Sequence, residues 1–93
     1  MNEKIIKISV ITFCEYHQIT PDFIYELQQN GLVELLQEND TNFISNEQLD
    51  LLEKYIRMHY ELGINIEGIE VITRLLSQME QMQEELNLLK RRL

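Results

Sequence analysis

Hydrophobic residues recur along the chain with two different periods, and polar residues or glycines separate the segments that share one period. The first segment, KIIKISV, is rich in β-branched residues and alternates in part, which predicts a short strand over residues 4–10. The next segment, ITFCEYHQI, places Ile11, Cys14, Tyr16 and Ile19 at near-helical spacing. This spacing predicts a first helix of about two turns with these residues on its apolar face.

A second helix is predicted to begin at Thr20-Pro21-Asp22. Threonine can cap a helix, proline suits the first helical turn, and an acidic residue there complements the helix dipole. Asn30-Gly31 ends this helix, because both residue types tolerate the left-handed conformation that a helix terminus often needs. The apolar residues that would face the core are Phe23, Ile24 and Leu27.

The segment LVELLQENDTNFIS has two short apolar pieces around the polar turn QENDTN, which predicts a β-hairpin. Two helices joined by a short turn and followed by a hairpin make a winged helix-turn-helix, a mainly α-helical fold. Ser45 or Asn46 would cap a third helix over Glu47–Leu62, and Gly63 would end it. The apolar residues of this helix are Leu49, Leu52, Tyr55, Ile56 and Leu62.

A fourth helix is predicted from about Ile66 to the C-terminus, and its apolar residues are spaced alternately three and four apart. These residues, called the seam below, are Ile72, Leu75, Met79, Met82, Leu86, Leu89 and Leu93. The small N-terminal core uses the other helices, so a second copy of the chain is the simplest cover for the seam. The alternative is an amphipathic helix packed within one chain, since three heptads meet only the lower limit for a coiled coil.

We therefore predict two units in the chain. Residues 1–63 would form the winged helix-turn-helix domain, and residues 64–93 would form a dimerisation helix with the dimer contact along the seam. The cations at the end of this helix, Lys90, Arg91 and Arg92, suit a helix C-terminus.

Charge is distributed unevenly along the chain, whose formal net charge is -8. Between Lys7 and Lys54 there is no lysine or arginine, whereas from Lys54 onward six basic residues balance six acidic ones. A solvated acidic surface is one explanation, and a surface that attracts a basic partner is the other. The nine acidic residues between the two lysines are Glu15, Asp22, Glu26, Glu34, Glu38, Asp40, Glu47, Asp50 and Glu53.

Length and composition favour one small domain, with 93 residues, 44% of them hydrophobic, and a single proline. No apolar run approaches the roughly 18 residues needed to cross a bilayer, and the N-terminus lacks a signal peptide's apolar core, so we expect a cytoplasmic protein without membrane contact. The single cysteine, Cys14, has apolar neighbours and is predicted to be a buried packing residue.

Catalytic and metal-binding patterns are weak in this sequence. Cys14, His17 and His59 would supply three metal ligands with no recognisable fourth, whereas structural zinc normally needs four. A cysteine nucleophile would need an exposed thiol of low pKa, and no glycine-rich phosphate loop or serine nucleophile motif is present. We therefore expect no enzyme, no metal and no cofactor.

The order of these segments resembles the MerR-type winged-helix fold and, within it, the chaperone modulatory proteins of the CbpM type. The resemblance is carried by ITFCEYHQIT leading into a second helix that ends in GLVE, and by RMHYELGINIEGI leading into LLSQMEQMQEELNLLKRRL. It spans nearly the whole chain and includes no catalytic motif. It implies an antiparallel homodimer that binds the J-domain of a CbpA-type co-chaperone and blocks the basic face with which that J-domain engages Hsp70.

The chain departs from the DNA-binding members of the MerR group at the residues that would contact DNA. Those proteins carry arginine and paired tyrosines in the second helix, where this chain has Tyr25, Glu26 and Leu27. They also carry arginines in the wing, where this chain has Glu38, Asn39, Asp40 and Asn42. Because phosphate binding depends on lysine and arginine, the acidic recognition helix would repel DNA.

The acidic residues of the second helix and the wing are therefore the predicted contacts for a basic J-domain: Asp22, Tyr25, Glu26, Glu38 and Asp40. Candidate apolar anchors beside them are Tyr25, Phe43, Tyr16 and Leu36. The alternative function is a MerR-like transcriptional regulator that binds DNA through Lys54, Arg57, Lys90, Arg91 and Arg92.

Overall fold

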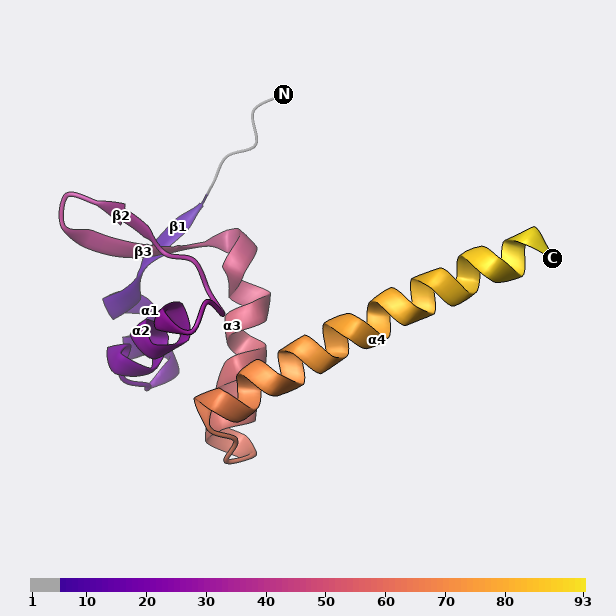
Figure 1. Ribbon diagram of the computed structural model, residues 1–93. Coiled ribbons are helices and arrows are strands. Elements are labelled where there is room, and N and C mark those ends of the chain that lie inside the picture. Colours follow the sequence, from indigo (N-terminus) through magenta and orange to yellow (C-terminus); the bar gives the residue numbers. More distant parts are fainter. Residues whose placement is uncertain (1–5) are drawn as a thin grey trace, which may run out of the picture.

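The computed structural model describes residues 6–93 and confirms a mainly α-helical winged helix-turn-helix with a long C-terminal helix (Figure 1). Residues 4 and 5 of the predicted first strand lie outside the described residues. The elements, in chain order, are β1 (Lys7–Ser9), α1 (Val10–His17), α2 (Pro21–Gln29), β2 (Leu36–Glu38), β3 (Thr41–Ser45), a 3-10 turn η1 (Asn46–Gln48), α3 (Leu49–Ile56), a π-helical turn η2 (Arg57–Glu61) and α4 (Ile66–Arg92).

Helix α1 begins one residue earlier than the sequence pattern predicts. Ser9 caps it, because its hydroxyl oxygen accepts a hydrogen bond from the Thr12 N–H at 3.1 Å, so Val10 is already helical and the strand ends at Ser9. The buried face of α1 consists of Val10, Phe13 and Cys14. The prediction that Ile11 and Tyr16 belong to the apolar face is wrong, since their side chains are 53% and 82% exposed. Spacings of three and then two residues spread Ile11, Cys14 and Tyr16 around the helix instead of along one side.

Helix α2 has the boundaries and the inner face that the sequence predicts. Phe23, Ile24 and Leu27 are buried, and Pro21 is the first helical residue. Thr20 occupies the capping position, but its hydroxyl makes no capping hydrogen bond. Gly31 follows the helix with φ +73°, which a residue without Cβ adopts at little cost.

The wing is confirmed as a hairpin of β2 and β3, joined to β1 in one antiparallel sheet of order β1-β3-β2. Asn39 and Asp40 form its two-residue turn with φ values of 49° and 63°. Both values are left-handed, as a type I′ turn requires, and short polar side chains tolerate this conformation better than most.

The predicted third helix, Glu47–Leu62, is divided into η1, α3 and η2. Ser45 precedes η1 without a capping hydrogen bond from its side chain, and Asn46 lies inside that turn. Of its apolar residues, Leu52 and Tyr55 are buried, whereas Leu62 is 69% exposed and lies outside the core. The π-helical turn has more residues per turn than an α-helix, which rotates Leu62 away from the buried side. Gly63, with φ +69°, ends the segment as predicted.

One hydrophobic core joins α1, α2, β3, α3 and the first turns of α4. Tyr55 lies at its centre: it is 1% exposed, and its hydroxyl donates to the carbonyl of Leu32 at 3.3 Å. Burial raises the pKa of this phenol, and a hydrogen bond with the Thr73 side chain on α4 opposes that rise. Cys14 is a buried packing residue, as predicted, and burial raises the pKa of its thiol.

Helix α4 is packed against the domain at its N-terminal end. The Asn65 side chain accepts a hydrogen bond from the Gly68 N–H at 2.8 Å, and a Cβ on Gly68 would come within 2.8 Å of the Ile64 side chain. Ile66 and Ile69 are buried in the core, but every residue from Arg74 to Leu93 is exposed, and the helix projects away from the domain (Figure 1). Among residues 6–93, no helix combines the length and apolar character that a membrane span requires.

Leucine-to-alanine substitutions at two positions test the assignment of this core. We expect Leu52→Ala to lower the free energy of unfolding by about 2–5 kcal/mol, because it opens a cavity beneath α3. The control Leu62→Ala should change it by less than about 0.5 kcal/mol, because this side chain is exposed. Urea denaturation followed by circular dichroism measures both, and equal midpoints for the two variants would contradict the assignment.

Candidate functional site

Helix α2 and the wing form one continuous surface. The Asn42 amide of β3 donates to the Tyr25 hydroxyl of α2 at 3.3 Å, so the hairpin is attached to the recognition helix. Asp22 and Glu26 of α2 are exposed, as is Asp40 at the tip of the wing, whereas Tyr25 is half-buried. The elements that carry the predicted contact residues therefore adjoin one another.

Glu38 differs from the other predicted contact residues because it forms an ion pair. Lys7 of β1 reaches across β3, lies 4.7 Å from the centre of the Phe43 ring and pairs with the carboxylate of Glu38 on β2. The sheet register explains this contact, since it places Ser9 and Leu36 opposite Phe43 and leaves Lys7 and Glu38 on the same face. This pairing was not predicted from the sequence, because the two residues lie on strands that are far apart in the chain.

Among residues 6–93, the other acids in the first half of the chain form no ion pair. Within the part of the chain that the structure describes, the two ion pairs are Lys7 with Glu38 and Glu70 with Arg74. All nine acidic residues between Lys7 and Lys54 are exposed. This half of the molecule therefore presents a predominantly negative surface, which attracts cationic partners and repels phosphate.

The basic residues predicted for DNA binding are not gathered around the recognition helix. Lys54 and Arg57 are exposed on α3 and at the start of η2. Lys90, Arg91 and Arg92 end α4, which carries them far from the helix-turn-helix (Figure 1). Within residues 6–93, one copy of the chain therefore offers no continuous basic surface that includes α2.

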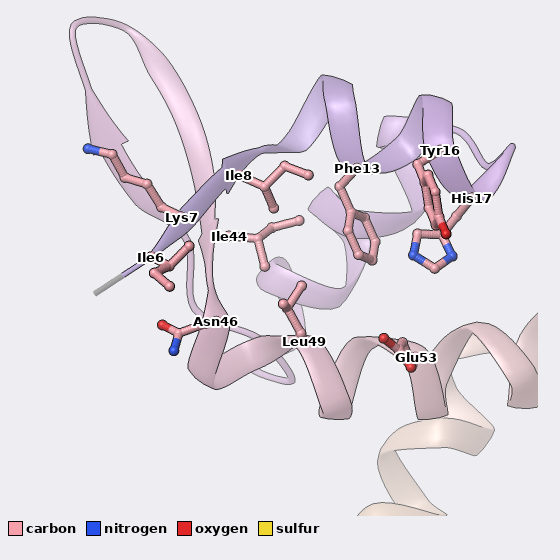
Figure 2. A pocket seen from close by; sticks show the side chains of 10 residues that line it. All are labelled: Ile6, Lys7, Ile8, Phe13, Tyr16, His17, Ile44, Asn46, Leu49 and Glu53. Carbon is pink, nitrogen blue, oxygen red and sulfur yellow. The ribbon is translucent and has the colours of Figure 1, made fainter. Parts of the chain in front are cut away.

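An apolar groove with a volume of about 380 Å³ lies where β1, α1 and α3 meet. Figure 2 shows Ile8, Phe13, Ile44 and Leu49 converging at its middle, between Ile6 at one end and Tyr16 at the other. The sequence analysis missed this groove, because it is assembled from five separate elements. The complete lining is Ile6, Lys7, Ile8, Phe13, Tyr16, His17, Ile44, Asn46, Leu49 and Glu53.

Cys14, His17 and His59, the candidate metal ligands in the sequence, are occupied by packing. The His17 ring lies 4.3 Å from the Phe13 ring, and the His59 ring stacks on Phe23 at 4.7 Å between centroids. His59 Nδ1 also lies 2.8 Å from the carbonyl oxygen of Ile64. Because a carbonyl oxygen can only accept, the histidine nitrogen donates this hydrogen bond. Across residues 6–93, no group of three or more His, Cys, Asp or Glu side chains is arranged to hold a metal ion.

The seam predicted on α4 is exposed to solvent. Ile72 is half-buried, whereas the five following seam residues are between 46% and 66% exposed. Five large apolar side chains in register along one helix form a stripe that soluble monomers rarely leave uncovered. These five residues are Leu75, Met79, Met82, Leu86 and Leu89.

Comparisons with known proteins agree with this architecture. The chaperone modulatory protein CbpM of Pseudomonas putida strain W619 is 29% identical over 90 residues, covering 96% of this chain and 89% of the relative. CbpM of Pseudomonas entomophila strain L48 is 24% identical with the same coverage. These names describe modulatory proteins, not enzymes, and the predicted resemblance to the CbpM type is confirmed. A family model described as MerR HTH family regulatory protein matches residues 8–91, and the chain therefore belongs to this helix-turn-helix family.

Proposed function

We propose that this protein is a non-catalytic chaperone modulator that binds the J-domain of a CbpA-type co-chaperone and hinders its engagement of Hsp70. The observation that carries the proposal is a helix-turn-helix whose recognition helix and wing present carboxylates in place of lysine and arginine. The names of the full-length relatives support a modulatory role. The J-domain as the target comes from the resemblance to the CbpM type.

Charge complementarity explains how such a contact would form. The uncompensated acids on α2 and the wing, Asp22, Glu26 and Asp40, attract a basic surface before contact and orient it. Exposed charges contribute mainly to the association rate, whereas apolar anchors supply most of the affinity. Covering the basic face of a J-domain would block Hsp70 by steric exclusion, so the mechanism needs no covalent step.

Neutralising the acidic face tests this proposal. We expect a variant with Asp22→Asn, Glu26→Gln, Glu38→Gln and Asp40→Asn to bind the co-chaperone more slowly. At low salt its association rate constant should fall to about one tenth of the wild-type value or below. Asparagine at position 40 retains a short polar side chain at φ 63°, so the wing turn is preserved. Stopped-flow association and J-stimulated ATP hydrolysis by Hsp70 are the two measurements, and the variant should inhibit hydrolysis less than the wild type.

The matched control removes the same number of negative charges elsewhere. Glu61→Gln, Glu80→Gln, Glu84→Gln and Glu85→Gln alter exposed residues on η2 and α4. This control should associate at nearly the wild-type rate. If both quadruple variants slow association equally, net charge and not the acidic face is responsible, and the proposed contact is wrong.

We also propose that α4 mediates a homodimer through the seam, with the antiparallel sense that the MerR resemblance implies. Helix α4 packs against the domain only at its start, and the seam beyond it exposes large apolar side chains. A second copy of α4 would bury them. The division into a domain of residues 1–63 and a dimerisation helix of residues 64–93 is part of this proposal.

Charged substitutions in the seam test the dimer. Met82→Glu with Leu86→Lys should halve the mass measured by light scattering, because ionised side chains in the seam must be desolvated on pairing. The control Gln81→Glu with Asn87→Lys introduces the same charges beside the seam and should remain dimeric. A dimeric mass for the Met82 and Leu86 variant would show that the seam is not the interface.

DNA binding is the second candidate function, favoured by the family description and by the exposed Lys54 and Arg57. We expect at most weak electrophoretic shifts of duplex DNA at low salt, lost at physiological salt, because counterion release makes such binding steeply salt-dependent. Sequence-specific binding that persists at physiological salt would favour a transcriptional regulator over a chaperone modulator.

A further inference from the structure

The acidic face provides attraction but few accessible apolar anchors. Among the anchor candidates, Tyr25 is half-buried and its hydroxyl is bonded to Asn42, while Phe43 is half-buried beneath Lys7. Leu36 is 39% exposed. Tyr16 is 82% exposed and lies on a different surface, at one end of the apolar groove. The apolar surface best placed to anchor a partner is therefore the groove.

The groove combines an apolar middle with an uncompensated negative charge. Lys7 at one end is neutralised by Glu38. Glu53 at the other end makes no ion pair among residues 6–93. The volume of about 380 Å³ lies near the lower end of the roughly 300–1,000 Å³ of ligand pockets, which suits a few side chains. The complementary partner therefore has an apolar ridge with a lysine or arginine beside it.

We propose that this groove is the docking site for an amphipathic helix of the co-chaperone, whose apolar ridge is flanked by basic residues. This inference rests on the proposed function and adds the apolar anchor site to it. The ridge inserts among Ile8, Phe13 and Leu49, and Tyr16 covers it from the side. A basic residue of the same helix pairs with Glu53. Tyrosine is one of the residue types that most often dominate the binding energy of an interface once a partner covers them.

A helix fits this surface better than an added strand. The sheet has two edge strands, β1 and β2, and each has three residues. The edge beside the groove is β1, which leads directly into α1. So short an edge offers few backbone hydrogen bonds to an incoming strand. The groove is instead bordered by two helices, α1 and α3, as in the helix-in-groove mode of recognition.

Two single substitutions test the groove by calorimetry with a full-length CbpA-type co-chaperone. Tyr16→Ala should raise the Kd about tenfold or more, and Glu53→Lys should do the same through charge repulsion. Both side chains are exposed, so unchanged circular dichroism and melting temperature are expected. Ile11→Ala on α1 and Asp50→Lys on α3 are the matched controls, since both residues are exposed and neither lines the groove.

The possible outcomes separate the groove from the proposed function. If the wild type binds and only the two groove variants lose affinity, the docking site is supported. If the wild type binds and the groove variants match their controls, the groove is excluded as the docking site while the proposed function stands. If the wild type binds no J-domain co-chaperone at all, the proposed function fails, and the docking inference fails with it.

Discussion

Helix α3 packs between the segment that follows α2 and the first turns of α4, and the rest of the structure depends on this packing. Leu52 and Tyr55 are completely enclosed, and Tyr55 is hydrogen-bonded to the Leu32 carbonyl after α2 while its hydroxyl lies beside Thr73 of α4. This one side chain therefore contacts the recognition-helix end and the start of the projecting helix.

The charge of the residues on the recognition helix and the wing, and not the fold, distinguishes this chain from the DNA-binding members of the MerR group. A helix-turn-helix supplies a scaffold on which different residues create different sites. Here the recognition helix carries Asp22 and Glu26, and Lys7, beside the wing, is paired with Glu38. The scaffold on which DNA-binding relatives would carry arginines for phosphate contact therefore carries exposed carboxylates here.

Local sequence signals predicted much of the fold. The Thr20-Pro21-Asp22 start, the Asn39-Asp40 turn and Gly63 each mark an element boundary through the backbone preferences of a few adjacent residues. The exposure of Tyr16 and Leu62 was not predicted. Tyr16 lies two residues after Cys14 and therefore on another side of α1, and the π-helical turn after α3 rotates Leu62 away from the buried side.

The candidate sites were harder to predict, because they depend on contacts between distant segments. The acids of α2 and the wing were identifiable from composition, but the Lys7–Glu38 ion pair follows from strand order, which periodicity does not reveal. The groove likewise requires β1, α1 and α3 to converge around Ile8 and Leu49. The sequence identified Tyr16 as a candidate aromatic anchor. It did not reveal that Tyr16 and Glu53 line the same groove.

Amide chemical-shift mapping tests most directly whether this helix-turn-helix binds a basic protein surface in place of DNA, as we propose. The ¹⁵N-labelled protein would be titrated with an unlabelled CbpA-type co-chaperone and, separately, with duplex DNA at physiological salt. The account predicts that the co-chaperone perturbs amides of α2, the wing and the groove around Tyr16, while DNA perturbs none of them. Perturbation of α2 and the wing by DNA, with no response to the co-chaperone, would contradict it.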